Sequence, residues 1–162
     1  MRIRSLVLLM LLPIGLLGCG GSDTSSTDAY ADLAYTHNTP LNPTQAALAQ
    51  QLVLYFTVGN KGPDPMLEST VTIKVGQGLR LNSVGCIPDP ISRAACPPAI
   101  ATTESSATFS LPPQQAGGFV TIVPIATPTV TVPSQVNASA SVSSPSDSTA
   151  ANNSAALTIA LQ

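Results

Sequence analysis

Apolar and polar residues alternate with a period of two through most of the chain, and this pattern constrains the fold more than any other feature of the sequence. Successive side chains of a β-strand point to opposite faces, so a period of two predicts strands that turn one face toward a core. The first strand is expected to open with Ala31-Asp32-Leu33. The alternating segments that follow are 52–58, 70–75, 79–84, 107–111, 120–125, 136–143 and 155–161.

Turn-forming residues separate these segments, among them Gly59-Asn60-Lys61-Gly62-Pro63, Gly76-Gln77-Gly78 and Pro112-Pro113. A helical period is visible only over 45–51, which is long enough for one turn of helix at most. We expect both faces of the 52–58 strand to be covered, and one face of the 136–143 strand. Seven or eight short strands joined by such turns predict an all-β fold, a two-sheet antiparallel sandwich.

The first nineteen residues have the layout of an export signal. A basic start (MRIR) precedes an apolar run over 6–17, which is too short to span a bilayer, since spanning takes roughly 20 residues. The run ends in Leu16-Leu17-Gly18-Cys19, which resembles the processing site of bacterial lipoproteins, where a diacylglycerol is attached to the cysteine and the signal is cut before it. An ordinary secretory signal cut elsewhere is the alternative, and it would leave an odd cysteine exposed.

The expected organisation is therefore a signal peptide over 1–18, a lipidated Cys19 with a flexible tether over 19–29, and one folded domain over 30–162. The lipid anchor would hold the protein at a membrane of the cell envelope. In enteric bacteria an Asp directly after the lipidated cysteine is the usual signal for retention at the inner membrane. This chain has Gly20 there, so we expect the outer membrane, on its periplasmic or its surface side.

Cys86 and Cys96 form an even pair once Cys19 carries lipid. In an exported chain such a pair predicts a disulfide. A zinc site needs about four nitrogen or sulfur ligands, and His37 is the only histidine, so a metal site is not expected here. Nine intervening residues also differ from the C-x-x-C spacing of thiol oxidoreductases.

The mature chain is weakly acidic. Without the signal peptide it carries four basic side chains, at positions 61, 74, 80 and 93, against eight acidic ones, a net charge of −4. No cluster of basic residues is available to neutralise phosphates, so a nucleic-acid partner is not expected.

Two groups of motifs carry a family resemblance. Tyr55-Phe56-Thr57-Val58 leads into the Asn60–Pro63 turn, and the tail has N-A-S-A-S-V-S over 137–143 followed by Asp147 and Asn152-Asn153. This pattern resembles the conserved immunoglobulin-like repeat of bacterial and archaeal surface proteins known as domain of unknown function eleven, over about residues 30–162. The resemblance implies an immunoglobulin-like antiparallel β-sandwich of seven to eight strands, with Cys86 and Cys96 where many members carry a cysteine pair. The family commonly forms tandem arrays, whereas this chain holds one copy.

The motif residues suit turn chemistry. Gly62 supplies a backbone conformation that other residues avoid, and Pro63 stops strand pairing. Asp147, Asn152 and Asn153 can cap backbone groups of the last hairpin. A weak ligand site is the alternative, because carboxylate and amide oxygens also suit Ca²⁺, although one carboxylate is few for a tight site.

No arrangement of residues points to catalysis. His37 lies in a Thr-His-Asn-Thr-Pro segment where a solvated loop histidine is expected, and no G-x-S-x-G motif or phosphate-binding glycine loop is present. We expect no enzyme activity, cofactor or metal. The expected function is a structural or protein-protein interaction role with a protein partner in the envelope. The alternative is a ligand-binding module for glycan or Ca²⁺, using the turns near Asn60, Asp64, Asp147 and Asn152.

Overall fold

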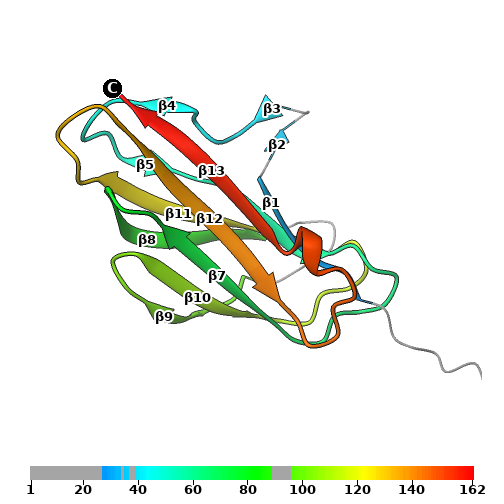
Figure 1. Ribbon diagram of the computed structural model, residues 1–162. Helices are drawn as coiled ribbons and strands as arrows, with labels where there is room; N and C mark the ends of the chain where they lie inside the picture. The colour runs from blue at the N-terminus through cyan, green and yellow to red at the C-terminus, as the bar shows by residue number, and fades with distance from the viewer. Residues whose placement is uncertain (1–26, 34, 37–38, 89–95) are drawn as a thin grey trace, which may run out of the picture.

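The computed structural model shows an all-β sandwich of two packed sheets (Figure 1). It describes residues 27–33, 35–36, 39–88 and 96–162. The signal peptide, Cys19 and His37 lie outside the described residues, as does the tether up to residue 26. Helical structure within the described ranges is limited to the 3₁₀ turn η1 (Ala150–Asn152), and no described helix is long and apolar enough to cross a bilayer.

One sheet has five strands, in the order β1-β6-β11-β5, with β8 paired to β11. Their bounds are β1 Ala29–Leu33, β5 Leu52–Val53, β6 Phe56–Asn60, β8 Leu79–Pro88 and β11 Phe119–Pro128.

The other sheet has six strands, in the order β4-β13-β12-β7-β10-β9. Their bounds are β4 Gln45–Ala46, β7 Ser69–Val75, β9 Ala99–Thr102, β10 Ser106–Leu111, β12 Ser134–Ser143 and β13 Ser154–Leu161. A separate pair is formed by β2 (Tyr35–Thr36) and β3 (Thr39–Pro40).

The period-two pattern becomes the core of the sandwich, as predicted. On β12 the alanine and valine side chains are buried, while the alternate asparagine and serine residues are exposed or half-buried. Opposite them on β13, Leu157 pairs with Ala138 and Ile159 with Val136. Inward-facing residues of both sheets form one hydrophobic cluster, including Phe56, Ile73, Phe109 and Ile122.

The predicted strand over 52–58 is wrong in two respects. It is interrupted between β5 and β6, because the side-chain amide of Asn42 pairs with the backbone of Tyr55 at the break. Asn42 Oδ1 accepts from Tyr55 N–H at 2.7 Å, and Asn42 Nδ2 donates to Tyr55 C=O at 2.8 Å. The second face is also less covered than predicted: Leu54 and Phe56 are fully buried, whereas Val53 is exposed and Tyr55 and Thr57 are half-buried.

The sandwich is also not wholly antiparallel. β4 pairs in parallel with the end of β13, where Ala160 lies opposite Gln45. The segment 45–51 therefore starts as a strand and continues into a tight turn at Ala49, whose φ is 63°. The weak helical period of this segment, too short for more than one turn, does not become a helix in the structure.

The strand count of the described residues is higher than predicted. Four of the thirteen strands have two residues each, which is too short for a period to show. The sequence pattern also missed β9, because all four of its residues are exposed and no alternation marks it.

The fold begins before the predicted boundary at residue 30. Thr27 is 1% exposed and forms a β-bridge with Asp147, and Ala29 is fully buried. The tether predicted to reach residue 29 is therefore at least three residues shorter.

The first described residue, Thr27, and the C-terminus lie at opposite ends of the sandwich (Figure 1). β1 starts opposite Asn60, the last residue of β6, and Gly59 lies opposite Phe119 at the start of β11. The β12–β13 connection lies at this same end, which we call the entrance end (Figure 1). The far end holds the C-terminus, residues 76–78 and the loop 129–133.

Candidate functional site

The side chain of Asn60 is a hydrogen-bond centre at the entrance end. It is fully buried. Its Oδ1 accepts from the backbone N–H of Asp28 at 3.2 Å and of Gly62 at 3.0 Å. Its Nδ2 donates to the carbonyl of Asp64 at 2.7 Å and, more weakly, to that of Gln114 at 3.4 Å. One amide thus joins its own turn to the segment before β1 and to the loop before β11.

The backbone around Asn60 makes the same connections. Asn60 N–H donates to Gly118 C=O at 3.0 Å, and Gly117 N–H donates to Asn60 C=O at 2.8 Å. Lys61 N–H donates to Asp28 C=O at 2.7 Å, and its ammonium lies 4.3 Å from the centre of the Tyr30 ring. The turn therefore fastens the start of the fold.

Pro63 follows on the exposed outside of this turn, whereas Gly62 is buried within it. Gly62 contributes the N–H that meets Asn60 Oδ1, so its backbone closes an Asx turn. The unusual backbone conformation predicted for Gly62 is wrong, because the described glycines with a positive φ are Gly78 and Gly117. Neither residue contributes a side-chain polar group that could hold a ligand.

Asp147 fastens the start of the fold from the other sheet. Its Oδ1 accepts from the backbone N–H of Ala29 at 3.3 Å and of Thr149 at 3.0 Å. Its Oδ2 accepts from Asn153 Nδ2, in a short hydrogen bond. Asn152 Nδ2 donates to Asp28 Oδ1 at 2.7 Å.

Thr27 completes this arrangement. Its hydroxyl donates to the carbonyl of Ser146 at 2.6 Å, and its own carbonyl accepts from Ser148 N–H at 3.0 Å and Ser148 Oγ at 2.8 Å. We call this network the N-terminal clasp. Its members are Thr27, Asp28, Asn60, Asp147, Asn152 and Asn153.

Three features of the clasp bear on cation binding. The described residues contain no group of three or more His, Cys, Asp or Glu side chains placed to hold a metal ion. The carboxylates of Asp28 and Asp147 each accept N–H donors, which is how a structural carboxylate is satisfied. However, Asn152 Oδ1 and Asn153 Oδ1 are buried without a hydrogen-bond partner.

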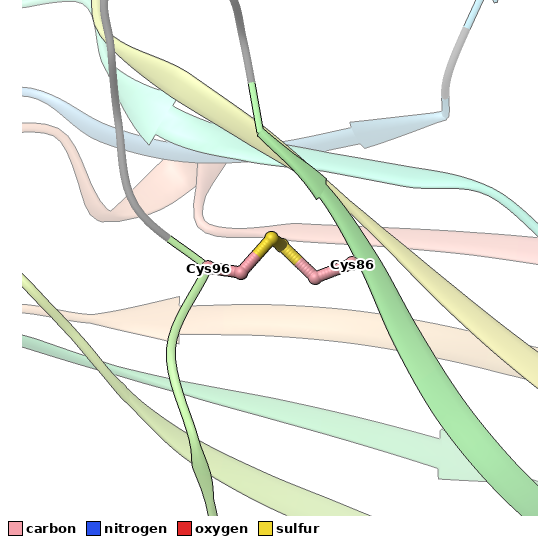
Figure 2. The surroundings of a disulfide bond; sticks show 2 residues. All are labelled: Cys86 and Cys96. Carbon is pink, nitrogen blue, oxygen red and sulfur yellow. A yellow bond between two sulfur atoms is a disulfide. The ribbon is translucent and has the colours of Figure 1, made fainter.

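Cys86 and Cys96 form the predicted disulfide, with their Cα atoms 5.7 Å apart (Figure 2). Cys86 lies on β8 in the five-stranded sheet, and Cys96 lies just before β9 in the six-stranded sheet. The bond therefore ties the two sheets together where the chain crosses between them. It is a structural cross-link, typical of proteins outside the cytoplasm.

A shallow cleft of about 580 Å³ opens beside this cross-link. It lies where the segments before β7 and β9 meet the end of β10. Most of its lining is apolar, and Glu68 is the only acidic or basic residue among the lining residues. The lining residues are Leu67, Glu68, Cys96, Pro97, Pro98, Ser110, Leu111, Pro112 and Pro113.

β9 forms one border of the six-stranded sheet. All four of its residues, Ala-Ile-Ala-Thr, are exposed, and Ile100 is 64% exposed. Border strands commonly carry charged residues or prolines that discourage pairing with another chain. β9 has neither within its bounds.

The sequence identified four of the six members of the clasp. It selected Asn60, Asp147, Asn152 and Asn153. The first three bond residues 28 and 29, and Asn153 bonds Asp147. It missed Thr27 and Asp28, because their composition continues the polar Ser/Thr/Asp stretch before them. No sequence signal pointed to Gln114, whose carbonyl meets Asn60 and which is 1% exposed.

The fold is similar to several solved structures. The seventh ScaB type I cohesin from Pseudobacteroides cellulosolvens superposes with a TM-score of 0.52 at 10% identity, covering 83% of this chain and 92% of the cohesin. A CARDB domain from Pyrococcus furiosus gives 0.49 at 13% identity, covering 85% and 96%. The RrgB pilus protein from Streptococcus pneumoniae gives 0.48 at 10% identity, covering 75% of this chain and 23% of RrgB.

No family model matches the sequence, and no curated protein matches it. The cohesin superposition shows the fold alone, at 10% identity. The chain has an immunoglobulin-like or cohesin-like all-β sandwich, and the predicted fold class is confirmed.

Proposed function

We propose that the protein is a non-catalytic lipoprotein of the cell envelope, attached through acyl chains on Cys19, whose β-sandwich serves a structural or protein-binding role. The observation that carries the proposal is the N-terminal clasp. It fixes the segment that leads away from Cys19 to both sheets at once, through Asn60 on one and Asp147 beside the other.

A clasp at this position suits an anchored protein. Any pull between the membrane and the domain acts on Thr27 first, and Thr27 is held by side-chain and backbone hydrogen bonds to the 146–148 loop. The disulfide adds a covalent tie between the sheets at the same end of the molecule, since Ile87 and Pro88 lie opposite the first residues of β11. An oxidising compartment outside the cytoplasm agrees with this bond.

Intact-mass analysis of the protein extracted from membranes tests the anchor. We expect the mass of residues 19–162 plus acyl groups on Cys19, less two hydrogens for the Cys86–Cys96 bond. A Cys19→Ser variant is the matched control, because it should be released from the membrane fraction without loss of the disulfide. A mature mass without acyl groups would refute the anchor. Separation of inner and outer membranes then tests the outer-membrane location.

We place the protein partner at β9. An extended segment of another envelope protein can add to an exposed border strand, with the backbone supplying hydrogen bonds. Ile100→Lys introduces a charge on this strand, and Val132→Lys does so at the far end as a control; both side chains are more than 60% exposed. Affinity capture from native membranes should recover a stoichiometric partner with the unchanged protein and Val132→Lys, and lose it with Ile100→Lys. Equal recovery with all three would place the partner elsewhere.

A second candidate function is ligand binding at the clasp. Asn152 Oδ1 and Asn153 Oδ1 are unpartnered acceptors beside two carboxylates, and such oxygens suit Ca²⁺. Calorimetry with Ca²⁺ and a glycan array test this candidate. If neither experiment detects binding, ligand binding at the clasp is refuted. A glycan is the weaker ligand of the two, because the chain has no tryptophan and three tyrosines to stack on sugars.

The motifs around Asn60 and Asp147 also support a proposed kinship with domain of unknown function eleven, as a single copy. In the structure these two residues meet the same segment, so their joint presence has one physical reason. Mutating either to Ala in an established member of that family should lower its stability by a similar amount.

A further inference from the structure

The exposed apolar residues at the entrance end lie beside the point where the anchored segment joins the fold. Leu67, at the rim of the cleft, is 73% exposed, which is the highest value among the large hydrophobic residues that the structure describes. Pro98 and Pro113 are exposed on the same cleft. Ile87, next to the disulfide, is 53% exposed. We call these four residues the apolar rim.

A short series of hydrogen bonds connects this rim to Thr27. The carbonyl of Glu68, next to Leu67, accepts from Ser144 Oγ at 3.0 Å. Ser144 Oγ lies 3.3 Å from Ser146 Oγ, which lies 3.0 Å from Thr27 Oγ1. The rim and the start of the fold are therefore neighbours at one end of the sandwich.

The chain length between Cys19 and Thr27 limits what can cover the rim. Eight residue steps extend at most about 29 Å, and any flexible coil of that length would average about 14 to 17 Å. A lipid-anchored domain on so short a connection meets the bilayer surface at a high effective concentration. The bilayer that holds the acyl chains is thus the surface that the rim encounters most often.

The charges around the rim favour zwitterionic over anionic lipid headgroups. Acidic side chains prevail at this end, at positions 28, 64, 68 and 147. Among the residues that the structure describes, Lys61 is the only basic side chain at this end, because Lys74 and Arg80 lie toward the far end. An anionic headgroup would be repelled by this balance, and a zwitterionic one would not. The contact is therefore apolar in character.

We infer that the apolar rim of Leu67, Ile87, Pro98 and Pro113 rests on the surface of the zwitterionic bilayer that holds Cys19, so that the sandwich stands on its entrance end. This inference depends on the proposed lipid anchor. It leaves the β9 border and the far end turned toward the aqueous phase. The anchor and the rim then act as two contacts with one membrane.

Tryptophan fluorescence tests the orientation, because the chain contains no tryptophan and a single introduced one reports on its own surroundings. The test variant is Leu67→Trp. The control is Val132→Trp, which is 63% exposed at the far end. A third variant, Ile87→Trp, samples the rim from another strand, in case Leu67→Trp disturbs its loop. Each lipidated protein is reconstituted in phosphatidylcholine vesicles with ordinary or brominated acyl chains.

We expect Leu67→Trp and Ile87→Trp to emit at shorter wavelength than Val132→Trp and to lose most of their emission to the brominated chains. Val132→Trp should keep its emission. Adding phosphatidylglycerol at low salt should reduce the quenching of the rim variants.

Three results would overturn the inference. If all variants float with the vesicles but none is quenched, the anchor holds and the rim does not touch lipid. If the rim tryptophans shift to shorter wavelength without quenching, a second copy of the chain covers the rim instead. If no variant floats with the vesicles, the anchor itself is absent and the proposed function fails with it.

Discussion

The side-chain oxygen of Asn60 accepts a hydrogen bond from the backbone N–H of Asp28 across 3.2 Å, joining the end of one strand to the residue that precedes another. Asn60 is fully buried, so no water replaces this bond if it is lost. The same amide also closes its own turn through Gly62. A single side chain therefore determines both the shape of a turn and the place where the chain joins the sandwich.

Asn60→Ala should destabilise the protein strongly. It leaves the N–H groups of Asp28 and Gly62 and the carbonyl of Asp64 without their side-chain partner, and each unsatisfied buried group costs about 1 to 3 kcal/mol. We expect a loss of roughly 2 to 4 kcal/mol in urea unfolding. Asn82→Ala is the matched control, because its amide makes one exposed hydrogen bond, to Thr127, and the expected change is within about 0.5 kcal/mol. Equal midpoints for the two variants would contradict the role of Asn60.

Asp147→Ala should loosen the start of the fold more than the rest of it. The change removes the acceptor for the N–H groups of Ala29 and Thr149 and for Asn153 Nδ2. We expect a global loss of about 1 to 3 kcal/mol and faster amide hydrogen exchange at Ala29. The control is Glu104→Ala, whose side chain is exposed at the far end. Unchanged exchange at Ala29 in Asp147→Ala would show that the carboxylate does not hold this segment.

The period of two identified most of the core, because burial on one face is what creates the pattern. It could not identify β9, whose residues are all exposed, or β4, whose two residues form a parallel pair with β13. The break between β5 and β6 was hidden for a different reason. At Tyr55 the backbone bonds the side-chain amide of Asn42 in place of a neighbouring strand. Asn42 is thirteen residues away in sequence, so no local pattern predicts this partner.

The residues of the clasp were likewise predictable from the local sequence only in part. Asn60 and Asp147 stand out because turns favour these residue types. Their shared target at residues 28 and 29 depends on which strands are neighbours, and this follows from the sheet order rather than from local sequence. Thr27 and Asp28 have the same residue types as the polar stretch before them. Only the three-dimensional structure therefore shows that they are part of the fold.

Removal of the disulfide should weaken the tie between the sheets. The cysteines are 10 positions apart, and closing a loop of this size stabilises a chain by about 2 to 3 kcal/mol. The double variant Cys86→Ala/Cys96→Ala should therefore lose about 2 to 3 kcal/mol of unfolding free energy and unfold at a lower urea concentration. Reducing agent should bring the unchanged protein to nearly the same midpoint and leave the double variant where it is. A shift of the double variant by reducing agent would show that another thiol contributes.

Calcium should not change the stability if the clasp is purely structural. Both of its carboxylates already accept N–H donors. We expect equal thermal midpoints in millimolar Ca²⁺ and in EDTA. A ligand bound only by the native state raises stability by about 2.7 kcal/mol at one hundred times its dissociation constant, so even a millimolar site would show at high Ca²⁺. A rise that Asp147→Ala abolishes would instead favour the ligand-binding function.

Two strand glycines that pair with β11 should respond to alanine in opposite directions. A Cβ on Gly59 would lie 2.3 Å from the carbonyl oxygen of Gly118 and 2.7 Å from Phe119 Cβ, so the start of β11 would have to move. Such overpacking costs about 1 to 3 kcal/mol. A Cβ on Gly85 meets its nearest atom, the carbonyl oxygen of Val123, at 3.7 Å, which is ordinary contact. Gly85→Ala should be neutral or stabilise by up to about 1 kcal/mol, because alanine restricts the unfolded chain. Urea unfolding of both variants measures the difference, and a Gly59→Ala protein as stable as Gly85→Ala would refute the close approach of β6 and β11 beside Asn60.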